Sequence, residues 1–132
     1  MKKELDEKLV EKYPLIFKDI NADMKMTAMC WGFECDDGWY WLIDNLCDSI
    51  QSYIDNNKHL TIEQIVATQV KEKFGGLRFY VNGGNEYIDG MVSFAENLSY
   101  RICEDCGSTE NVTQSDGWIY TRCEKCHKLK IG

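Results

Sequence analysis

Two Cys-x-x-Cys pairs near the C-terminus constrain the fold of this chain more than any other feature. Cys103 and Cys106 belong to CEDC, and after 16 intervening residues Cys123 and Cys126 belong to CEKC. Each Cys-x-x-Cys turn can aim two sulfurs at one ion, and two such turns complete a tetrahedral four-thiolate zinc site. The segment between the pairs has about the length that a β-hairpin needs. We therefore predict a zinc ribbon with one structural zinc ion per chain, bound by these four cysteines.

Other uses of these cysteines are less consistent with the sequence. Disulfides would suit an exported chain, but the N-terminal sequence MKKELDEKLVEKYPLIF lacks the apolar segment of a signal peptide, and seven cysteines are an odd number. Residues 123–127 also match the haem-attachment pattern C-x-x-C-H, which would leave the first pair unexplained. His127 is an alternative ligand in place of Cys126, or a solvated histidine beside the metal site.

Length and charge limit the classes of protein to be considered. The 132 residues suit a single domain with one core, and an apolar content of 44% argues against disorder. The formal net charge of -7 disfavours broad, non-specific nucleic-acid binding, because phosphate repels an acidic surface. A local basic patch can still oppose that average. An acidic protein can also occupy the nucleic-acid-binding surface of another protein.

Hydrophobic periodicity predicts a helix that follows Asp36, Asp37 and Gly38. Either aspartate is suited to cap this helix. Apolar residues at spacings of three and four form one stripe, which is typical of an amphipathic helix. The stripe consists of Trp39, Leu42, Ile43, Leu46, Ile50, Tyr53 and Ile54.

Other segments add one further amphipathic helix and a helix-prone N-terminus. The second stripe covers about residues 86–101 and leads directly into Cys103. Residues 2–12 are charged and helix-prone, and Pro14 ends that segment. Residues 21–35 are ambiguous, with room for one short strand.

A β-hairpin is predicted between the two amphipathic helices, with Gly75-Gly76 as a two-residue turn. Opposed residues in a hairpin share a face of the sheet. Phe74 and Leu77 then belong to an apolar face, and a cationic face with one tyrosine lies opposite. The predicted pairs are Phe74/Leu77, Lys73/Arg78, Glu72/Phe79, Lys71/Tyr80 and Val70/Val81.

Together these segments predict one α+β domain over residues 1–132. Two amphipathic helices pack on a small antiparallel sheet, and an integral C-terminal zinc ribbon occupies about residues 102–128. Within the ribbon, residues 111–114 and 118–122 are the expected strands.

Three groups of side chains are candidates for binding a partner. The cationic hairpin face suits phosphate or carboxylates, and its alternative is an ordinary solvated face. Large aromatics at the start of the first amphipathic helix suit a protein contact, or else pack under the N-terminal segment. The C-terminal tail is basic enough for weak, salt-sensitive contact with nucleic acid. The three groups are Lys71, Lys73, Arg78 and Tyr80; Tyr40 and Trp41; and Arg122, Lys125, Lys128 and Lys130.

No catalytic constellation emerges, so we expect a non-enzymatic protein. The two histidines are His59, in a polar connector, and His127. A four-thiolate zinc site is also closed and leaves no open coordination position. The remaining thiols, Cys30, Cys35 and Cys47, are expected to be buried core residues rather than ligands of a second metal.

Three segments resemble a group of small uncharacterised proteins carried by bacteriophages and prophages. They are CDDGWYWLIDNLCDSI, QVKEKFGGLRFYV, and the stretch from AENLSYRICEDCG to GWIYTRCEKC. The resemblance covers roughly residues 8–127 and is most specific at KEKFGGLRFYV. It implies an accessory protein that works in the cytoplasm of a bacterial host.

The resemblance also shapes the expected function. We expect the protein to bind a host or phage protein complex, as an inhibitor of a bacterial defence nuclease in the manner of an anti-CRISPR protein. The alternative is a small zinc-ribbon factor that binds nucleic acid or associates with transcription. Neither expectation involves a membrane.

Overall fold

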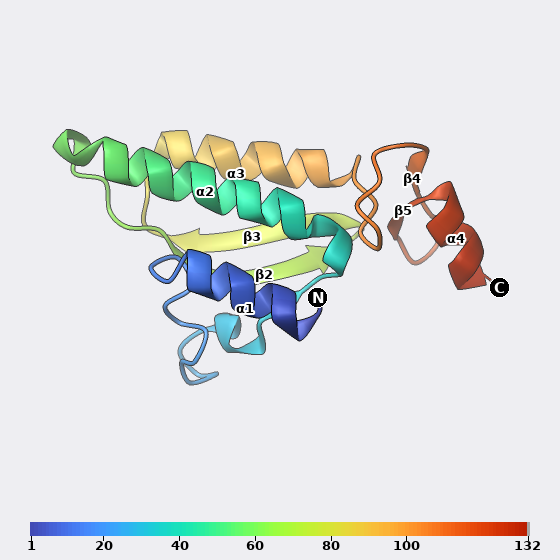
Figure 1. Cartoon of the computed structure of the whole chain (residues 1–132), viewed down its shortest axis with the longest axis horizontal. Coiled ribbons are helices and arrows are strands. Elements are labelled where there is room, and N and C mark those ends of the chain that lie inside the picture. Colours follow the sequence, from blue (N-terminus) through green and yellow to red (C-terminus); the bar gives the residue numbers. More distant parts are fainter. Residues whose placement is uncertain (132) are drawn as a thin grey trace.

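The computed structural model describes residues 1–131, and the side chains of residues 1–129. Three helices gather over one sheet, and a smaller unit with the second sheet lies at one end (Figure 1). In chain order the elements are α1 (Lys3–Lys12), η1 (Ala28–Trp31), β1 (Phe33–Glu34), η2 (Asp37–Trp39), α2 (Tyr40–Asn56), η3 (Lys58–Leu60), β2 (Val66–Lys73), β3 (Gly76–Asn82), α3 (Glu86–Ser99), β4 (Val112–Gln114), β5 (Thr121–Cys123) and α4 (Glu124–Ile131).

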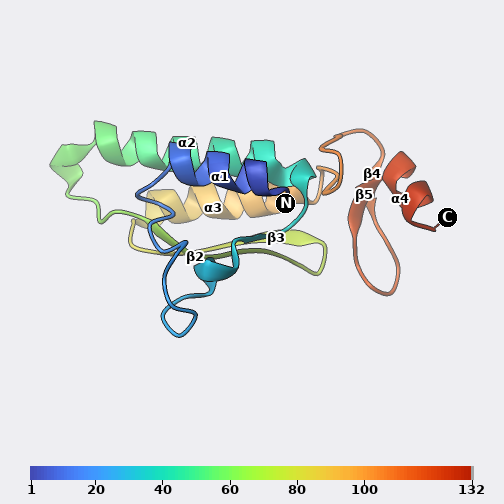
Figure 2. The same ribbon diagram turned by 60° about the horizontal axis from the view of Figure 1, so that its bottom comes forward.

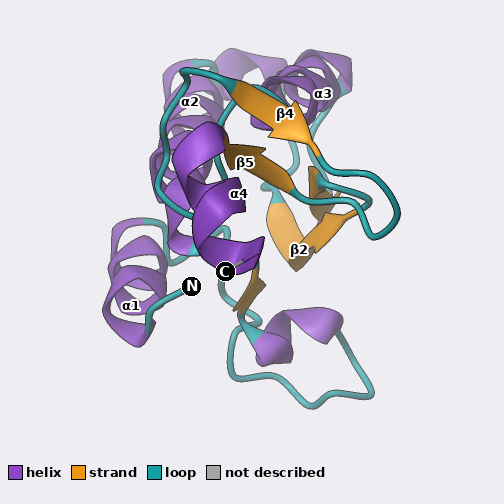
Figure 3. Ribbon diagram, turned by 90° about the vertical axis from the view of Figure 1, so that its right-hand side faces the viewer, coloured by secondary structure: helices purple, strands orange, loops and turns teal. Residues whose placement is uncertain are grey.

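The larger sheet has the strand order β1-β2-β3. β2 and β3 form the antiparallel hairpin that the sequence predicts. The short β1 lies in the segment where the sequence left room for one strand, and its parallel pairing with β2 was not predicted. α1, α2 and α3 surround one face of this sheet, as the turned views show (Figure 2, Figure 3). The predicted α+β fold, with a small sheet, packed helices and a C-terminal cysteine ribbon, is confirmed.

The core lies between the helices and the larger sheet. Trp39, Phe17 and Phe79 are the largest of its fully buried side chains. The predicted stripe of α2 faces this core, and burying one such large apolar side chain contributes about 1.5–3 kcal/mol. The buried members of the stripe are Trp39, Leu42, Ile43, Leu46, Ile50 and Ile54.

The predicted capping of α2 by an aspartate is wrong. A short 3-10 turn, η2, precedes α2, and neither N-cap residue, Asp36 for η2 or Trp39 for α2, forms a side-chain cap hydrogen bond. Asp37 instead accepts a hydrogen bond of 2.7 Å from the backbone N–H of Lys2, at the start of α1. The cause is Gly38, whose N–H donates to the carbonyl of Glu104 at 2.6 Å and so holds this segment against the ribbon.

The predicted register of the hairpin is also wrong. The turn residues are Phe74 and Gly75 rather than Gly75 and Gly76, and both have positive φ, 52° and 83°. The observed pairs are Lys73/Gly76, Glu72/Leu77, Lys71/Arg78, Val70/Phe79, Gln69/Tyr80, Ala67/Val81 and Val66/Asn82, with an irregularity between Ala67 and Gln69.

Packing explains the shift of the turn by one residue. The observed register opposes Val70 to Phe79, and both side chains are buried on the face that meets the helices. Phe74 is consequently 68% exposed in the turn and does not belong to the core, contrary to prediction. The first residue of β3 is a glycine, Gly76, because a Cβ atom at this position would lie 2.3 Å from the hydroxyl of Tyr100.

Side chains of α3 cover the outer edge of β3. Ser99 accepts a hydrogen bond of 2.9 Å from the backbone N–H of Leu77, and Glu96 accepts one of 2.8 Å from that of Phe79. Unpaired strand edges invite pairing with another chain. These two contacts therefore occupy donors that would otherwise recruit a further strand.

The C-terminal unit contains a second, two-stranded sheet, in which β4 pairs antiparallel with β5. Its strands are shorter than predicted, and α4 follows directly where the sequence indicated only a basic tail. Within the part of the chain that is described, no helix is long and apolar enough to cross a membrane.

Candidate metal centre

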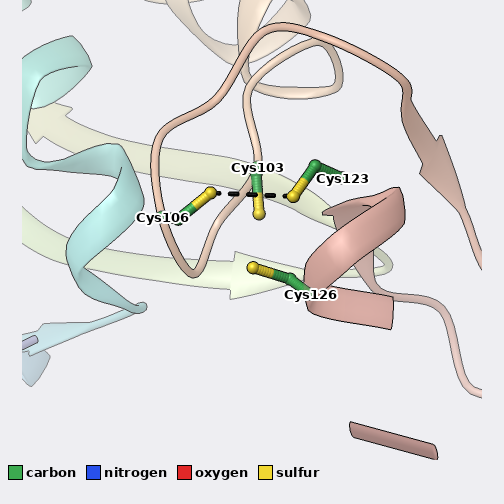
Figure 4. Close-up of side chains that lie close together, drawn as sticks. All are labelled: Cys103, Cys106, Cys123 and Cys126. Carbon is green, nitrogen blue, oxygen red and sulfur yellow. Dashed lines mark hydrogen bonds between the residues drawn. The ribbon is translucent and has the colours of Figure 1, made fainter. Parts of the chain in front are cut away.

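The structure brings the four predicted cysteines together at the junction between the two sheets (Figure 4). The Sγ atoms of Cys103, Cys106, Cys123 and Cys126 all lie within 4.8 Å of one another. Cys103, Cys123 and Cys126 are buried and Cys106 is exposed, and all four are free thiols rather than disulfides. The cluster can therefore hold a metal ion.

Local backbone structure aims the thiols at one point. Cys103 follows the end of α3, and the N–H of Gly107 donates to its carbonyl at 2.9 Å, which closes the first turn. Gly107 has a φ of 82°, a conformation that suits glycine. Cys123 ends β5 and Cys126 lies in the first turn of α4, so a strand-to-helix junction supplies the second pair.

The spacing of the sulfurs fits a tetrahedral thiolate site. The Sγ atoms of Cys106 and Cys123 are 3.7 Å apart. Four sulfurs placed about 2.3 Å from one zinc ion would be about 3.8 Å from one another. The backbone N–H of Cys126 lowers the pKa of Cys123 to about 7, whereas burial raises the pKa of Cys126, so without metal the cluster holds its ionised thiol at Cys123 rather than at Cys126.

His127 contacts Thr113 of β4 rather than the cysteine cluster. Its Nε2 lies 3.3 Å from the hydroxyl oxygen of Thr113 and 3.1 Å from the carbonyl oxygen of the same residue. Since Cys126 is itself in the cluster, the replacement of Cys126 by His127 is not seen. The histidine instead joins α4 to β4.

The cysteine cluster is joined to the larger sheet and to α2 through several contacts. The indole N–H of Trp39 donates to the carbonyl of Ile102 at 2.9 Å. A Cβ atom on Gly38 would lie 2.1 Å from the carbonyl oxygen of Cys103, so only glycine fits there. Across the junction, the hydroxyl of Thr121 donates to the carbonyl of Gly75 at 2.5 Å. Through these contacts the cysteine cluster packs against the segment that leads into α2 and against the hairpin turn.

Glu104 is a buried carboxyl at this junction, and no sequence pattern pointed to it. Its Oε2 accepts a hydrogen bond of 3.0 Å from the backbone N–H of Asp36. Burial raises its pKa to about 7, and the hydrogen bond opposes that shift without cancelling it. The residue thus links the first cysteine pair to the segment before α2.

The cationic hairpin residues share one face as predicted, but Arg78 is already engaged. Its guanidinium donates to the carbonyl of Leu77 at 3.0 Å and to the hydroxyl of Tyr100 at 3.3 Å. Lys71 is half-buried opposite Arg78, whereas Lys73 and Tyr80 are exposed. The ammonium of Lys73 lies 5.7 Å from the centre of the Phe74 ring.

The basic tail is partly neutralised within the molecule. Arg122 forms an ion pair of 3.2 Å with Asp105 and stacks 3.9 Å from the ring centre of Tyr120. Lys128 pairs with Glu124 at 2.9 Å along α4. Lys125 is exposed, and the side chain of Lys130 lies outside the described residues.

Of the two candidate aromatics on α2, Trp41 is the exposed one. Its side chain is 64% exposed, whereas Tyr40 is half-buried against the core. Trp41 lies beside Phe94 of α3, which is 70% exposed and which the sequence analysis did not select. The position of Phe94 off the apolar stripe of α3 was the signal that could have identified it.

A second aromatic site lies where the hairpin turn meets the ribbon. Phe74 and Trp118 line one cavity of about 370 Å³ together with Lys73 and Ile119. Trp118 is 77% exposed, in the loop between β4 and β5. The sequence pattern predicted Phe74 on the apolar face of the hairpin and Trp118 in a strand, so this pair was not predicted.

Two of the other three thiols, Cys35 and Cys47, belong to the core as predicted, whereas the same prediction for Cys30 is wrong. Cys35 and Cys47 are buried in the main apolar cluster, and burial raises the pKa of both thiols. Cys30 is half-buried and donates to the carbonyl of Thr27. Among the described side chains, the four clustered cysteines are the one group of three or more His, Cys, Asp or Glu placed to hold a metal.

Comparison with known proteins adds no assignment: no family profile, no curated protein and no solved structure matches this chain.

Proposed function

We propose that this protein is a non-enzymatic, phage-type accessory protein that binds a host or phage protein complex and inhibits a bacterial defence nuclease. We further propose that the metal is a structural zinc ion, one per chain, bound by Cys103, Cys106, Cys123 and Cys126. Zinc supports the local fold by cross-linking the end of α3 to β5 and α4. A closed four-thiolate site leaves no coordination position for a substrate.

One observation carries the proposal of a protein partner. Large aromatic side chains are exposed on rigid elements, while several of the cations that nucleic acid would contact are held by internal partners. Trp41 and Phe94 are exposed on adjacent helices, whereas Arg122 is paired with Asp105. Exposed aromatics of this size are typical anchors of protein interfaces. The net charge of -7 further disfavours a phosphate backbone.

The cavity beside the ribbon supports a second candidate, a zinc-ribbon factor that binds single-stranded nucleic acid. Phe74 and Trp118 offer ring faces on which bases can stack, and Lys73 lies at the same cavity. One lysine gives little of the cationic groove that such binding normally needs. We therefore place this candidate second.

A retention experiment separates the two candidates. Tagged, zinc-loaded protein is incubated with bacterial lysate, with and without nuclease treatment, and washed at about 150 mM salt, where the Debye length is about 8 Å. The proposal predicts that a specific protein complex survives nuclease treatment. It also predicts that adding the purified protein to that complex lowers its nuclease activity.

The contrary outcome is loss of every partner on nuclease treatment. Purified protein would then be tested with DNA and RNA oligonucleotides. Binding that falls steeply with salt, and that the triple change Lys71→Ala, Lys73→Ala and Arg78→Ala abolishes, would favour the second candidate. A second triple variant, with alanine at Lys125, Lys128 and Lys130, tests the basic tail in the same way.

A further inference from the structure

An apolar groove of about 250 Å³ runs between α2 and α3. We call it the α2–α3 groove. Leu42, Leu46 and Ala95 are its buried lining residues, and Trp41 and Phe94 project beside them with 64% and 70% exposure. Solvent-exposed aromatics beside an apolar floor are the usual composition of a protein-binding hot spot.

No other helix or strand of the described chain covers this groove. α2 and α3 lie side by side over the sheet, and nothing lies over their outer side (Figure 1, Figure 3). α1 packs against the opposite flank of α2, where Lys12 and Tyr13 both donate to the carboxylate of Asp44. The groove is therefore an open surface of the folded protein.

The charge on these two helices indicates what the groove can bind. α2 carries Asp44, Asp48 and Asp55, α3 carries Glu86, Asp89 and Glu96, and neither helix contains a lysine or an arginine. None of these carboxylates lines the groove itself, and Asp44 and Glu96 are occupied within the fold. Asp89 lies on the same side of α3 as Glu96, which faces the edge of β3, so Asp48 and Glu86 are the exposed carboxylates left to flank the groove. A second copy of the chain would bring like charges together, whereas a cationic partner would complement them.

We infer that the α2–α3 groove binds a basic amphipathic helix of a partner protein. Apolar residues of that helix, at spacings of three and four, enter the groove between Trp41 and Phe94, as in other helix-in-groove complexes. Its lysines and arginines pair with the exposed carboxylates beside the groove, Asp48 and Glu86. The inference rests on the proposed protein-binding function and adds the site and the chemistry of the partner.

The test uses designed peptides of about 18 residues, a length that allows a stable helix. The first has Leu and Trp along one face and Lys at the other positions. The second replaces every Lys by Glu, and the third keeps the composition of the first but has no apolar face. Binding to full-length, zinc-loaded protein is measured by fluorescence anisotropy. We expect the first peptide to bind about tenfold or more tightly than either of the others.

Variants of the protein locate the binding. Trp41→Ala and Phe94→Ala are each expected to lower the affinity for the first peptide by about tenfold. The matched control is Trp31→Ala, because Trp31 and Trp41 are both 64% exposed and Trp31 does not line the groove. This control should leave binding unchanged. Since all three side chains are exposed, the variants should fold.

Several results would overturn the inference. They are equal binding of the Lys and Glu peptides, an effect of Trp31→Ala as large as that of Trp41→Ala, and a dimer in sedimentation experiments that Trp41→Ala converts to monomer. The experiments also distinguish failure of the groove inference from failure of the proposed function. A lysate complex whose retention does not depend on Trp41 or Phe94 would reject the groove alone, and peptide binding without any retained complex would reject the function alone.

Discussion

Phe74 has a backbone conformation that bulky residues rarely adopt. Its φ is 52°, and the side chain is 68% exposed, so no core contact offsets the strain. A left-handed conformation costs an L-residue roughly 1–2 kcal/mol, and Asn-Gly is the preferred sequence for a turn with two positive φ values. We predict that Phe74→Asn raises the free energy of unfolding by about 1 kcal/mol. Urea denaturation would measure this change.

Leu77 provides the matched comparison for that prediction. Its side chain is fully buried in the same hairpin, and Leu77→Ala is expected to lower the free energy of unfolding by about 2–5 kcal/mol. Equal losses for the two variants would mean that Phe74 packs in the core after all. A more stable Phe74→Asn variant that no longer retains its partner would instead show that the strained residue serves binding.

Asp44 should make stability depend on pH. Lys12 and Tyr13 each donate to its Oδ1 at 2.6 Å. Burial acts to raise the pKa of Asp44, but these two hydrogen bonds outweigh it and lower the pKa below 3.8. A lowered folded-state pKa gives stability that is present above the unfolded value and is lost as pH falls through the folded value.

We therefore predict that Asp44→Asn lowers the free energy of unfolding at pH 7 by about 1 kcal/mol, the usual contribution of such hydrogen bonds. The difference from the unchanged protein should shrink as pH falls below 3.8, the ordinary value for this carboxyl. Parallel denaturation curves at several pH values would measure it. A difference that stays constant from neutral to acidic pH would contradict the assigned cause.

Among the elements, the start of α2 and the first cysteine pair form one packed unit. Gly38 has no room for a side chain, because a Cβ atom would lie 2.1 Å from the carbonyl oxygen of Cys103. We predict that Gly38→Ala lowers the free energy of unfolding by about 1–3 kcal/mol, as overpacking usually does, and also weakens metal retention. Thermal unfolding and competition with a chelator would measure the two effects.

Gly90 is the control for that substitution. It lies within α3 and is exposed, and a Cβ atom there would meet nothing within 4 Å. Gly90→Ala should raise the free energy of unfolding by about 0.5–1 kcal/mol through helix propensity. If both alanines were tolerated equally, the close packing of Gly38 on the cysteine pair would be disproved.

Metal removal should affect the C-terminal elements first. Cys106→Ser, or a strong chelator, should remove the link that the proposed zinc ion provides between α3 and β5. We expect the backbone amides of β4 and β5 to lose their protection from hydrogen exchange, because metal binding contributes directly to the folding of such small units. Elemental analysis should find one zinc per chain, and a protein that holds none or two would contradict the assignment.

Sequence patterns predicted the elements whose signals are local. The apolar stripe of α2, the helix over residues 86–99 and the convergence of the cysteines follow from spacing alone. The turn residues, the role of Asp37 and the parallel pairing of β1 with β2 depend on contacts between distant segments, such as Gly38 with Glu104. α4 was missed because KCHKLKI shows a basic tail more clearly than an amphipathic pattern.

Over the molecule as a whole, exposed aromatic rings favour contact with bases, whereas the net charge disfavours binding of nucleic acid. The net charge of -7 repels phosphate, and Arg78 and Arg122 are bound internally. We predict that isolated DNA and RNA oligonucleotides bind negligibly at about 150 mM salt, where unpaired surface charges are screened beyond about 8 Å. Fluorescence anisotropy would test this. Nanomolar, sequence-dependent binding to a DNA duplex at that salt concentration would overturn it.

The close contact at Gly38 also limits how such a chain can diverge over evolution. Surface positions on the helices and loops can exchange freely, but a related protein with this architecture has space for only a hydrogen atom at position 38. The backbone at that position lies directly against Cys103 and Glu104, which belong to the first cysteine pair and its turn. Distant relatives are therefore expected to share a sparse pattern, a glycine before a tryptophan far upstream of two Cys-x-x-Cys pairs, long after the rest of the sequence has changed.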